Sequence, residues 1–389
     1  MNKRELVARA ISVLFALQAV GCSDGGPTYF DACDGTVTEE ECYALRRDPS
    51  SAQVALASQI ALRYIDEHPP TAEEWDWTSG VLMFALTELY RVTGDARLRD
   101  YYQAWIDFHI EEGYRIFWSD SCPPALTAQA LLKEGDDASY RKVVDDVLEY
   151  LRTAPRIEQG GISHLGVVNI LSIWVDSLFM FGNVLTRQGE LADDQGALTL
   201  MSEQLGIFSD LLQNENGLLV HAYGWPEDFD TDIYWARGNG WVTASLADYL
   251  RVRFLRDETD PDATRMFLSQ VDGVLATQDP LSGMWWTVMN RPGETYLETS
   301  ATALFAYGIA RAYRYGVLGQ SELSAAKAAV EGVEGAVATD NQGRPYVTGI
   351  SAGTSVSTFE GYAAIPLEDD LNYGVGATIL ALIETSGLY

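Results

Sequence analysis

The chain has 389 residues, of which 47% are hydrophobic and 21% charged, so it can bury a sizeable core in one large or two ordinary domains. Its 26 basic and 56 acidic residues give a formal net charge of −30, which argues against nucleic acid and anionic membrane surfaces as partners. An acidic small-molecule substrate is not excluded, because charges more than roughly 8 Å apart are screened at physiological salt.

Residues 1–22 are predicted to be a lipoprotein-type signal peptide. Three basic side chains precede an apolar run over residues 10–20, which is too short to span a membrane as a mature helix. The run ends in Ala19-Val20-Gly21-Cys22, which resembles the cleavage box of a bacterial lipoprotein, with Ala19 in place of the usual leucine. We therefore expect a lipid on Cys22 and attachment to the cell envelope, periplasmic or at the outer membrane. The alternative is an ordinary secretory signal with a chance cysteine.

Residues 23–50 are predicted to tether the folded domain. Cys33 and Cys42 lie close enough in this segment to form a local disulfide in an oxidising compartment. Cys122 is left over, and the sequence assigns it no role. No group of cysteines and histidines has the spacing of zinc ligands, so we expect no metal.

From Ala52 onward, helical periodicity predicts twelve helices in six pairs. The first helix of each pair is charged on one face, and the second is apolar nearly all round, which places the second inside. We therefore expect an all-α fold, an (α/α)6 barrel over residues 51–389, with short strands near 284–288 and 345–347 in its loops. The expected helices span residues 52–66, 78–93, 95–112, 122–134, 137–153, 172–189, 194–213, 238–256, 261–277, 298–315, 321–337 and 372–387.

The inner helices of such a barrel run parallel, so their N-termini meet at one end. Five of the six expected inner helices begin with an aromatic ring beside polar groups. Helix capping explains the Asp, Ser, Thr and Asn residues there, but not the tryptophans or Arg237. Because helix N-termini are slightly positive, this end suits an anionic ligand. We place the functional site at that mouth of the barrel.

The sequence Tyr-Trp-Ala-Arg-Gly-Asn-Gly-Trp over residues 234–241 is the richest of these starts. Trp235 and Trp241 offer flat apolar faces, and Arg237 offers a planar charged fork that suits a carboxylate. A binding site for acidic sugars needs these groups. The alternative is a helix start with tryptophans in the core.

Asp176 is the carboxylate predicted to do chemistry. It lies in an apolar run over residues 170–181, where a carboxylate is costly unless it is paired or protonated. Burial raises a carboxyl pKa, which suits a general acid near neutral pH. Asp120 is a second carboxylate at an inner-helix start. His221 is a binding candidate, and His164 is a weaker candidate for an orienting role. The alternatives are helix caps for the aspartates and core positions for the histidines.

Together these stretches resemble the unsaturated uronyl hydrolases, which are the unsaturated rhamnogalacturonyl hydrolases of glycoside hydrolase family 105 and the related family 88. The resemblance covers roughly residues 50–389. Its carriers are residues 75–80, 93–95, 154–164, 174–180, 221, 235–241 and 298–301.

The resemblance implies an (α/α)6 barrel without a cofactor and an unusual reaction. Such enzymes remove a 4,5-unsaturated uronic acid from the non-reducing end of lyase products by hydrating the C4=C5 enol ether. By position, Asp176 matches the catalytic aspartate and Asp120 the second aspartate. The residues that match the substrate-contacting set are Trp77, His221, Trp235, Arg237 and Trp241.

This sequence departs from the pattern in places, which bears on the sugar and its aglycone. Residues 166–170 lack charged side chains, residues 181–183 lack a proline-bearing turn, and no acidic residue follows His221 closely. Glucuronyl and galacturonyl substrates are not distinguished. Two alternatives stay open: an inverting glycosidase that uses Asp176 and Asp120 as an acid–base pair, and a non-catalytic lipoprotein that binds acidic glycans. We expect a monomer.

Overall fold

The computed structural model describes residues 38, 42–43, 46–168 and 170–388. The predicted signal peptide, Cys22 and Cys33 lie outside the described residues. The lipid anchor and the pairing of Cys33 with Cys42 therefore stay predictions.

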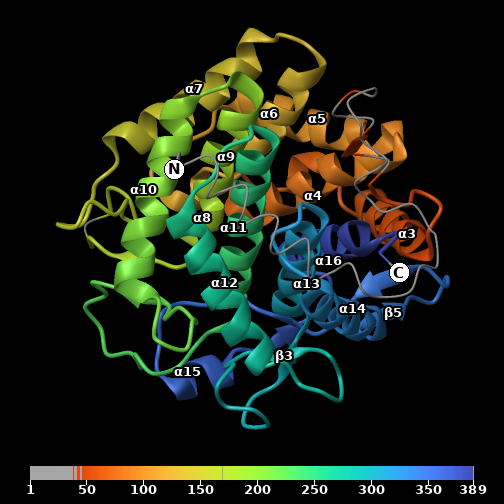
Figure 1. Cartoon of the computed structure of the whole chain (residues 1–389). Helices are drawn as coiled ribbons and strands as arrows, with labels where there is room; N and C mark the ends of the chain where they lie inside the picture. The colour runs from red at the N-terminus through yellow and green to blue at the C-terminus, as the bar shows by residue number, and fades with distance from the viewer. Residues whose placement is uncertain (1–37, 39–41, 44–45, 169, 389) are drawn as a thin grey trace, which may run out of the picture.

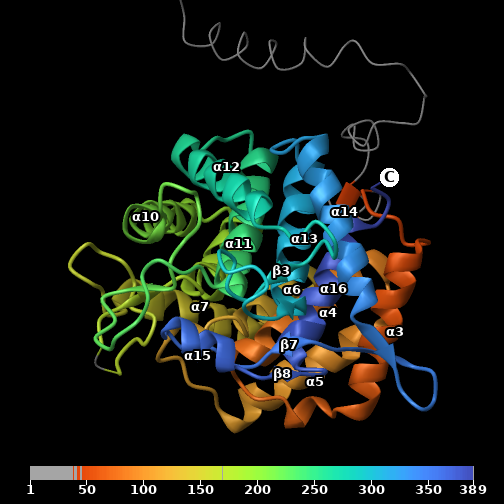
Figure 2. The same ribbon diagram turned by 90° about the horizontal axis from the view of Figure 1, so that it is seen from below.

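Two rings of helices form the body of the molecule. Figure 2 shows outer helices such as α3, α10, α12 and α14 around the inner helices α11, α13 and α16. The outer helices are α3 (Ala52–Glu67), α5 (Ala96–Glu112), α7 (Ala138–Thr153), α10 (Gln195–Leu212), α12 (Pro261–Ala276) and α14 (Gln320–Gly335). The inner helices are α4 (Trp77–Thr93), α6 (Ala125–Glu134), α8 (Ser177–Met180) with α9 (Gly182–Ala192), α11 (Ala236–Leu255), α13 (Thr299–Arg314) and α16 (Asn372–Thr385).

The inner helices are apolar because they pack on every side. Helix α11 contacts α13, α13 contacts α16 and α16 contacts α4, and these helices lie side by side in the middle of Figure 1. Nearly every residue of α13 and α16 is buried. The outer helices instead bury one face each, as their amphipathic sequences require. This confirms the predicted (α/α)6 barrel.

One predicted helix is wrong. Residues 172–189 do not form a single helix, because their first part pairs as a strand. The strand β1 (Ile173–Trp174) runs antiparallel to β2 (Ala222–Tyr223), and the Val175 amide donates to the His221 carbonyl at 2.8 Å. This pairing takes up backbone groups that a helix would need. It also brings Asp176 beside His221.

Short strand pairs and two 3-10 turns complete the loops. The expected strands at 284–288 and 345–347 are confirmed as β3 and β6, whereas α15 (Phe359–Ala364) was not predicted. The antiparallel pairs are β3 (Trp285–Trp286) with β4 (Leu297–Glu298), β5 (Val337–Thr339) with β6 (Pro345–Val347), and β7 (Ile350–Ser351) with β8 (Leu367–Glu368). The 3-10 turns are η1 (Pro70–Ala72) and η2 (Ser119–Ser121). In the part of the chain that the structure describes, no helix is both long and apolar enough to cross a bilayer.

The C-terminal ends of the inner helices meet in a buried set of charges, here called the closed-end network. Its members are Glu88, Arg187, Asp248, Arg311 and Glu384, from α4, α9, α11, α13 and α16. Arg311 joins the three carboxylates, with contacts of 3.0 Å to Glu88 and 2.9 Å to Glu384 and a hydrogen bond to Asp248.

The segment before α3 also enters the closed-end network. The Tyr43 hydroxyl donates to Glu88 at 2.5 Å, and Arg47 donates to Glu384 at 2.6 Å. Buried charges in proteins are usually paired with charges of the opposite sign, as they are here. The chain therefore enters the barrel at the end opposite the N-termini of the inner helices.

Candidate active site

The N-terminal ends of the inner helices carry a group of polar and aromatic side chains, here called the Asp176 cluster. Its members come from the turn η2, the loop before β1, strand β1, the start of α8 and the loops on either side of β2. They are Asp120, His164, Trp174, Asp176, His221 and Trp235, and all of them except Asp120 are at least nine-tenths buried. Most of these side chains would each be costly to bury alone, so their grouping indicates a site.

The first half of the cluster is a carboxylate–imidazole contact. His221 Nε2 lies 3.4 Å from Asp176 Oδ2, and the His221 ring packs on Trp235 with their centroids 4.4 Å apart. Asp176 is placed by the start of α8, where the amides of Phe179 and Met180 donate to its carbonyl. The β1–β2 pairing holds His221 in register with Val175. The sequence analysis placed Asp176 and His221 in one site, and the structure brings the two side chains close together.

The second half is a matching pair. His164 Nε2 lies 3.6 Å from Asp120 Oδ2, and His164 Nδ1 lies 3.0 Å from the Ser177 hydroxyl. The His164 ring stacks flat on Trp174, with centroids 4.4 Å apart and planes 8° apart. Burial lowers the pKa of His164 to about 4, so its imidazole is neutral at neutral pH.

The two carboxyl groups have different proton affinities. Burial raises the pKa of Asp120 well above its ordinary value, and the negative charges of Asp176 and Asp76 raise it further. Burial also acts to raise the pKa of Asp176, but the contact with His221 outweighs it and leaves that pKa below its ordinary value. In the ligand-free protein at neutral pH, Asp120 is therefore the more protonated group and Asp176 is the ionised one. The raised pKa that we expected for Asp176 from its apolar sequence is wrong, because His221 supplies a compensating contact.

Several buried polar atoms near the cluster have no hydrogen-bond partner among the described residues. They are the indole Nε1 atoms of Trp174, Trp225, Trp235 and Trp241, together with Arg237 Nε, His221 Nε2 and Asp176 Oδ2. Five of these seven atoms can only donate a hydrogen bond. Buried donors are almost always satisfied by protein, water or a ligand, so these atoms can donate hydrogen bonds to water or to a ligand with acceptor oxygens.

Arg237 makes contacts that the sequence did not predict. Its two terminal nitrogens donate to the carbonyls of Ser351 and Ala352 at 2.6 and 2.9 Å, and one also donates to the Thr354 hydroxyl at 2.9 Å. The guanidinium lies over the rings of Trp235 and Tyr373, 4.9 and 5.1 Å from their centroids. Arg237 thus anchors the end of β7 and the segment that follows it, and its Nε atom has no partner among the described residues.

Trp77 and Trp241 meet close to this arginine. The Trp77 ring lies edge-on to Trp241 with centroids 6.1 Å apart and packs on Tyr373 at 4.7 Å. Trp241 is fully buried and packs on Phe179, so its ring is mostly core, whereas Trp77 is half-buried. Their predicted contact with substrate stays a prediction.

Three contributors were not singled out from the sequence as site residues. Asp76 precedes α4, and burial raises its pKa to about 6. Trp225 packs edge-on to Trp174 with centroids 5.2 Å apart. Tyr362, on α15, contacts His221. Asp76 and Trp225 could have been found from the sequence, because an aspartate and a tryptophan there lie in loops next to the predicted site. Tyr362 lies 141 residues from His221, and no local pattern points to it.

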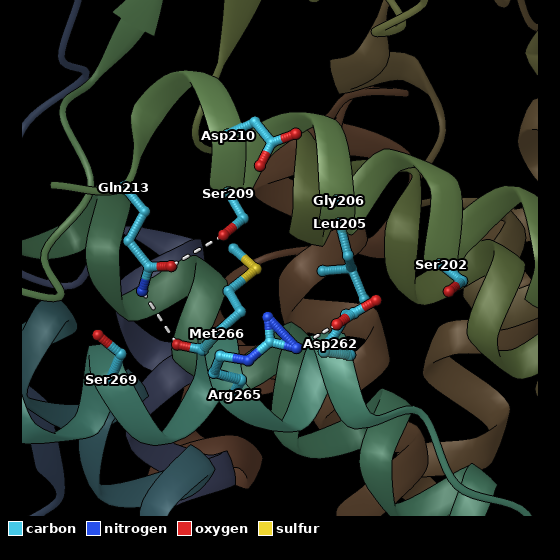
Figure 3. Close-up of a pocket in the computed structure, with 11 residues that line it drawn as sticks. Ser202, Leu205, Gly206, Ser209, Asp210, Gln213, Asp262, Arg265, Met266 and Ser269 are labelled. Atoms are coloured by element: carbon cyan, nitrogen blue, oxygen red, sulfur yellow. Dashed lines mark hydrogen bonds and ion pairs between the residues drawn. The ribbon is translucent and has the colours of Figure 1, made fainter.

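A groove elsewhere on the barrel does not compete with this site. Figure 3 shows it between the outer helices α10 and α12, with a volume of about 390 Å³. Its Arg265 pairs with Asp262, both side chains are exposed, and Gln213 is satisfied by backbone carbonyls. No group of histidine, cysteine, aspartate and glutamate residues that could hold a metal ion occurs within the described ranges.

Comparison with known proteins gives a consistent result. The model of Glycosyl Hydrolase Family 88 matches residues 55–389. The chain is 27% identical over 321 residues to the unsaturated rhamnogalacturonyl hydrolase YesR of Bacillus subtilis, which covers 80% of this chain and 89% of that protein.

Two solved structures share the fold. One is a possible member of the GH105 family from Klebsiella pneumoniae, with a TM-score of 0.76, 26% identity, and coverage of 94% of this chain and 98% of that one. The other is the unsaturated glucuronyl hydrolase of Bacillus sp. GL1, with a TM-score of 0.68, 19% identity, and coverage of 87% and 98%.

Proposed function

The chain belongs to Glycosyl Hydrolase Family 88, and we propose that it removes a 4,5-unsaturated uronic acid from the non-reducing end of lyase-generated oligosaccharides. The observation that carries this proposal is the pairing of an ionised carboxylate with an imidazole beside buried indole donors that have no partner among the described residues. A uronic acid supplies the acceptor oxygens that these donors need. The relative YesR is named for action on unsaturated rhamnogalacturonyl substrates, which agrees with this class.

Hydration of the enol ether needs one proton donor and one group that activates water. Asp176 gives a proton to C4, water adds at C5, and the resulting hemiketal opens and releases the aglycone. Asp176 is ionised before substrate binds. A bound uronate carboxylate placed nearby raises the proton affinity of Asp176, because like charges within ~4–6 Å disfavour ionisation. Asp120 lies close enough to Asp176 for the two charges to interact. On substrate binding, the proton that Asp120 holds passes to Asp176, and the Asp120 carboxylate that remains accepts a proton from the attacking water, which restores the starting state of both groups.

The remaining predicted residues are assigned to binding. Trp235 and Trp77 present ring faces and edges to the sugar, and the indole donors hold its hydroxyl groups. Arg237 contributes through Nε while its other nitrogens hold the segment after β7. The family membership does not favour a conventional inverting glycosidase or a non-catalytic glycan-binding protein.

The test is a panel of unsaturated disaccharides from pectin and from glycosaminoglycans, incubated with a protein that starts at residue 23. Loss of the ultraviolet absorbance of the conjugated enol ether reports hydration, and the substrate that loses it identifies the uronic acid. Saturated glycosides with the same aglycones are the matched controls. Cleavage of the saturated glycosides with no loss of absorbance on the unsaturated ones would overturn the proposal in favour of an inverting glycosidase.

We also propose that the protein is held at the bacterial cell envelope by a lipid on Cys22, as a monomer. The sequence of residues 1–22 supports the anchor. Mass spectrometry of the mature N-terminus tests it: a diacylglyceryl mass on a chain that starts at Cys22 is expected, and an unmodified N-terminus contradicts it. Light scattering in solution gives the oligomeric state.

A further inference from the structure

Tyr362 is a buried side chain that the proposed reaction has not yet used. It lies on the short helix α15, at the lower left of Figure 1, and only 1% of its surface is exposed. Its hydroxyl oxygen lies 2.7 Å from His221 Nδ1. The backbone amide of Ser357 donates to the same oxygen at 3.4 Å. One lone pair of the hydroxyl is therefore occupied, and its own proton is available to His221.

The carboxylate of Asp176 favours one direction of donation between Tyr362 and His221. When the Tyr362 hydroxyl donates to Nδ1, a neutral His221 carries its proton on Nε2. Nε2 is the atom that faces Asp176 Oδ2 at 3.4 Å. A line of donors then runs from the Ser357 amide through the Tyr362 hydroxyl to His221, whose Nε2–H faces the Asp176 carboxylate. The opposite tautomer would aim a lone pair of Nε2 at a carboxylate, which is repulsive.

The position of Tyr362 is itself determined by other contacts. The amide of Phe359, the first residue of α15, donates to the Asp230 carboxylate at 2.6 Å, and the Asp230 amide donates to the Ser357 carbonyl at 3.4 Å. Val356, just before α15, packs with Trp174 in a small apolar cluster. Helix α15 is thus held against the loop that follows His221, so the Tyr362–His221 contact is a built feature of the fold.

We propose that Tyr362 is a positioning residue, which holds His221 with its Nε2–H directed at Asp176 and so controls the proton that this pair keeps for the reaction. The inference rests on the proposed function. When the pair takes up one proton, either His221 donates from both nitrogens, or Asp176 becomes a carboxylic acid and donates to Nε2. In both forms Nδ1–H donates to the Tyr362 oxygen, which changes from donor to acceptor. Only N–H and O–H bonds change.

Other titratable groups also act on this pair, and the test must account for them. The groups whose charges reach Asp176, His221 or Tyr362 are His164, Asp120 and Asp230, with Asp76 acting on Asp120. None of them touches the Tyr362 hydroxyl, so removal of this hydroxyl leaves their own contacts in place.

The variant Tyr362→Phe removes one hydroxyl and keeps the ring. We expect kcat to fall by about tenfold, as for the loss of one hydrogen bond that acts in the transition state, with KM within about twofold. Both protonation states of the Asp176–His221 pair lose a hydrogen bond to the Tyr362 hydroxyl. The pH above which kcat/KM declines therefore moves away from its wild-type position.

Tyr307→Phe is the matched control. Tyr307 is also fully buried, and its hydroxyl donates to Asp248 at 2.8 Å in the closed-end network. This variant loses stability but keeps the kcat and the pH profile of the wild type. A Tyr362→Phe protein that is folded and has the kcat and pH profile of the wild type overturns the inference, because a merely structural hydroxyl has that signature.

A second readout does not depend on activity. The chain has four histidines, so nitrogen-15 NMR of labelled imidazoles is tractable, and a His221→Gln variant assigns the signal of His221. We expect the Nε2–H tautomer in the wild type and a mixture in Tyr362→Phe. An unchanged tautomer overturns the inference about Tyr362. A wild type that hydrates no unsaturated substrate overturns the proposed function instead, and the NMR result then decides the role of Tyr362 alone.

Discussion

Asp176 and His221 face each other across 3.4 Å between Oδ2 and Nε2, although 45 residues separate them in the chain. The β1–β2 strand pair creates this contact, since Val175 and His221 are joined through their backbones. The imidazole lowers the pKa of Asp176, whereas the pKa of Asp120 is raised well above its ordinary value by burial and by the charges of Asp176 and Asp76. One apolar region thus holds two carboxyl groups with opposite shifts, an arrangement typical of acid–base catalysis.

The variant Asp176→Asn should lose turnover and keep its fold. An amide fits the space of the carboxylate but cannot pass a proton to C4. General acid–base catalysis contributes about 10²–10⁴-fold, so we expect kcat to fall by at least about 10³-fold. The measurement is the loss of enol-ether absorbance under saturating substrate, together with the melting temperature of the variant.

Asp262→Asn is the control for this substitution. Asp262 is an exposed aspartate in the groove of Figure 3, far from the inner-helix N-termini. It should have wild-type kcat. Full activity of Asp176→Asn would remove this residue from the role of acid and leave Asp120 as the candidate.

Asp76 should make the stability of the protein depend on pH. Burial raises its pKa from the ordinary value of 3.8 to about 6, so the folded chain holds this proton more tightly than the unfolded chain. The stability that results is fully present below pH 3.8 and is lost as the pH rises to about 6. Asp76→Asn removes the dependence. Because the side chain is partly exposed, we expect the variant to be more stable at pH 7.5 by about 1 kcal/mol rather than the ~3 kcal/mol of a fully buried shift.

Urea unfolding at pH 4 and pH 7.5 measures this difference. Wild type and Asp76→Asn should have similar unfolding free energies at pH 4 and differ at pH 7.5. A difference of the same size at both pH values would show that the substitution acts through packing or helix capping and not through the proton.

The sequence predicted most of the fold because its helices are strongly patterned. Eleven of the twelve expected helices match those observed within a few residues, since charged outer faces and apolar inner helices are visible without knowledge of contacts. The exception, residues 172–189, contains the apolar run around Asp176. A short apolar segment fits a buried strand as well as a buried helix, and only the partner strand β2 decides between them.

The sequence predicted only the part of the site that depends on local patterns. Asp176, His221 and Trp235 lie in short stretches with unusual residues, so they could be singled out. Their pairing could not be predicted, and the direction of the Asp176 pKa was wrong because it depends on His221. The use of Arg237 as an anchor depends on carbonyls more than 110 residues away. Tyr362 belongs to a helix of six residues, too short to leave a periodic signal.

The closed-end network should govern stability without affecting catalysis. Arg311→Met leaves Glu88, Asp248 and Glu384 buried with one cation fewer, which costs about 3–5 kcal/mol for a broken buried pair. The network lies at the C-terminal ends of the inner helices, opposite the Asp176 cluster, so folded molecules should keep wild-type kcat. Arg265→Met, which breaks an exposed pair with Asp262, is the control and should change stability little. Urea unfolding gives the free energy of unfolding of each variant, and activity per folded molecule gives its kcat. An Arg311→Met protein with the wild-type free energy of unfolding would contradict the prediction.

The net charge of −30 should make the reaction sensitive to salt. The substrate is an anion, and the Asp176 cluster adds its own ionised carboxylate, so the long-range field and the local field both repel it. Raising the ionic strength from about 0.01 M to 0.15 M shortens the screening length from about 30 Å to about 8 Å, and kcat/KM should therefore rise severalfold. The methyl ester of the same unsaturated uronate carries no charge and should show no change. A fall in kcat/KM with salt for the acid alone would mean that Arg237 and the helix N-termini attract the substrate more strongly than the rest of the molecule repels it.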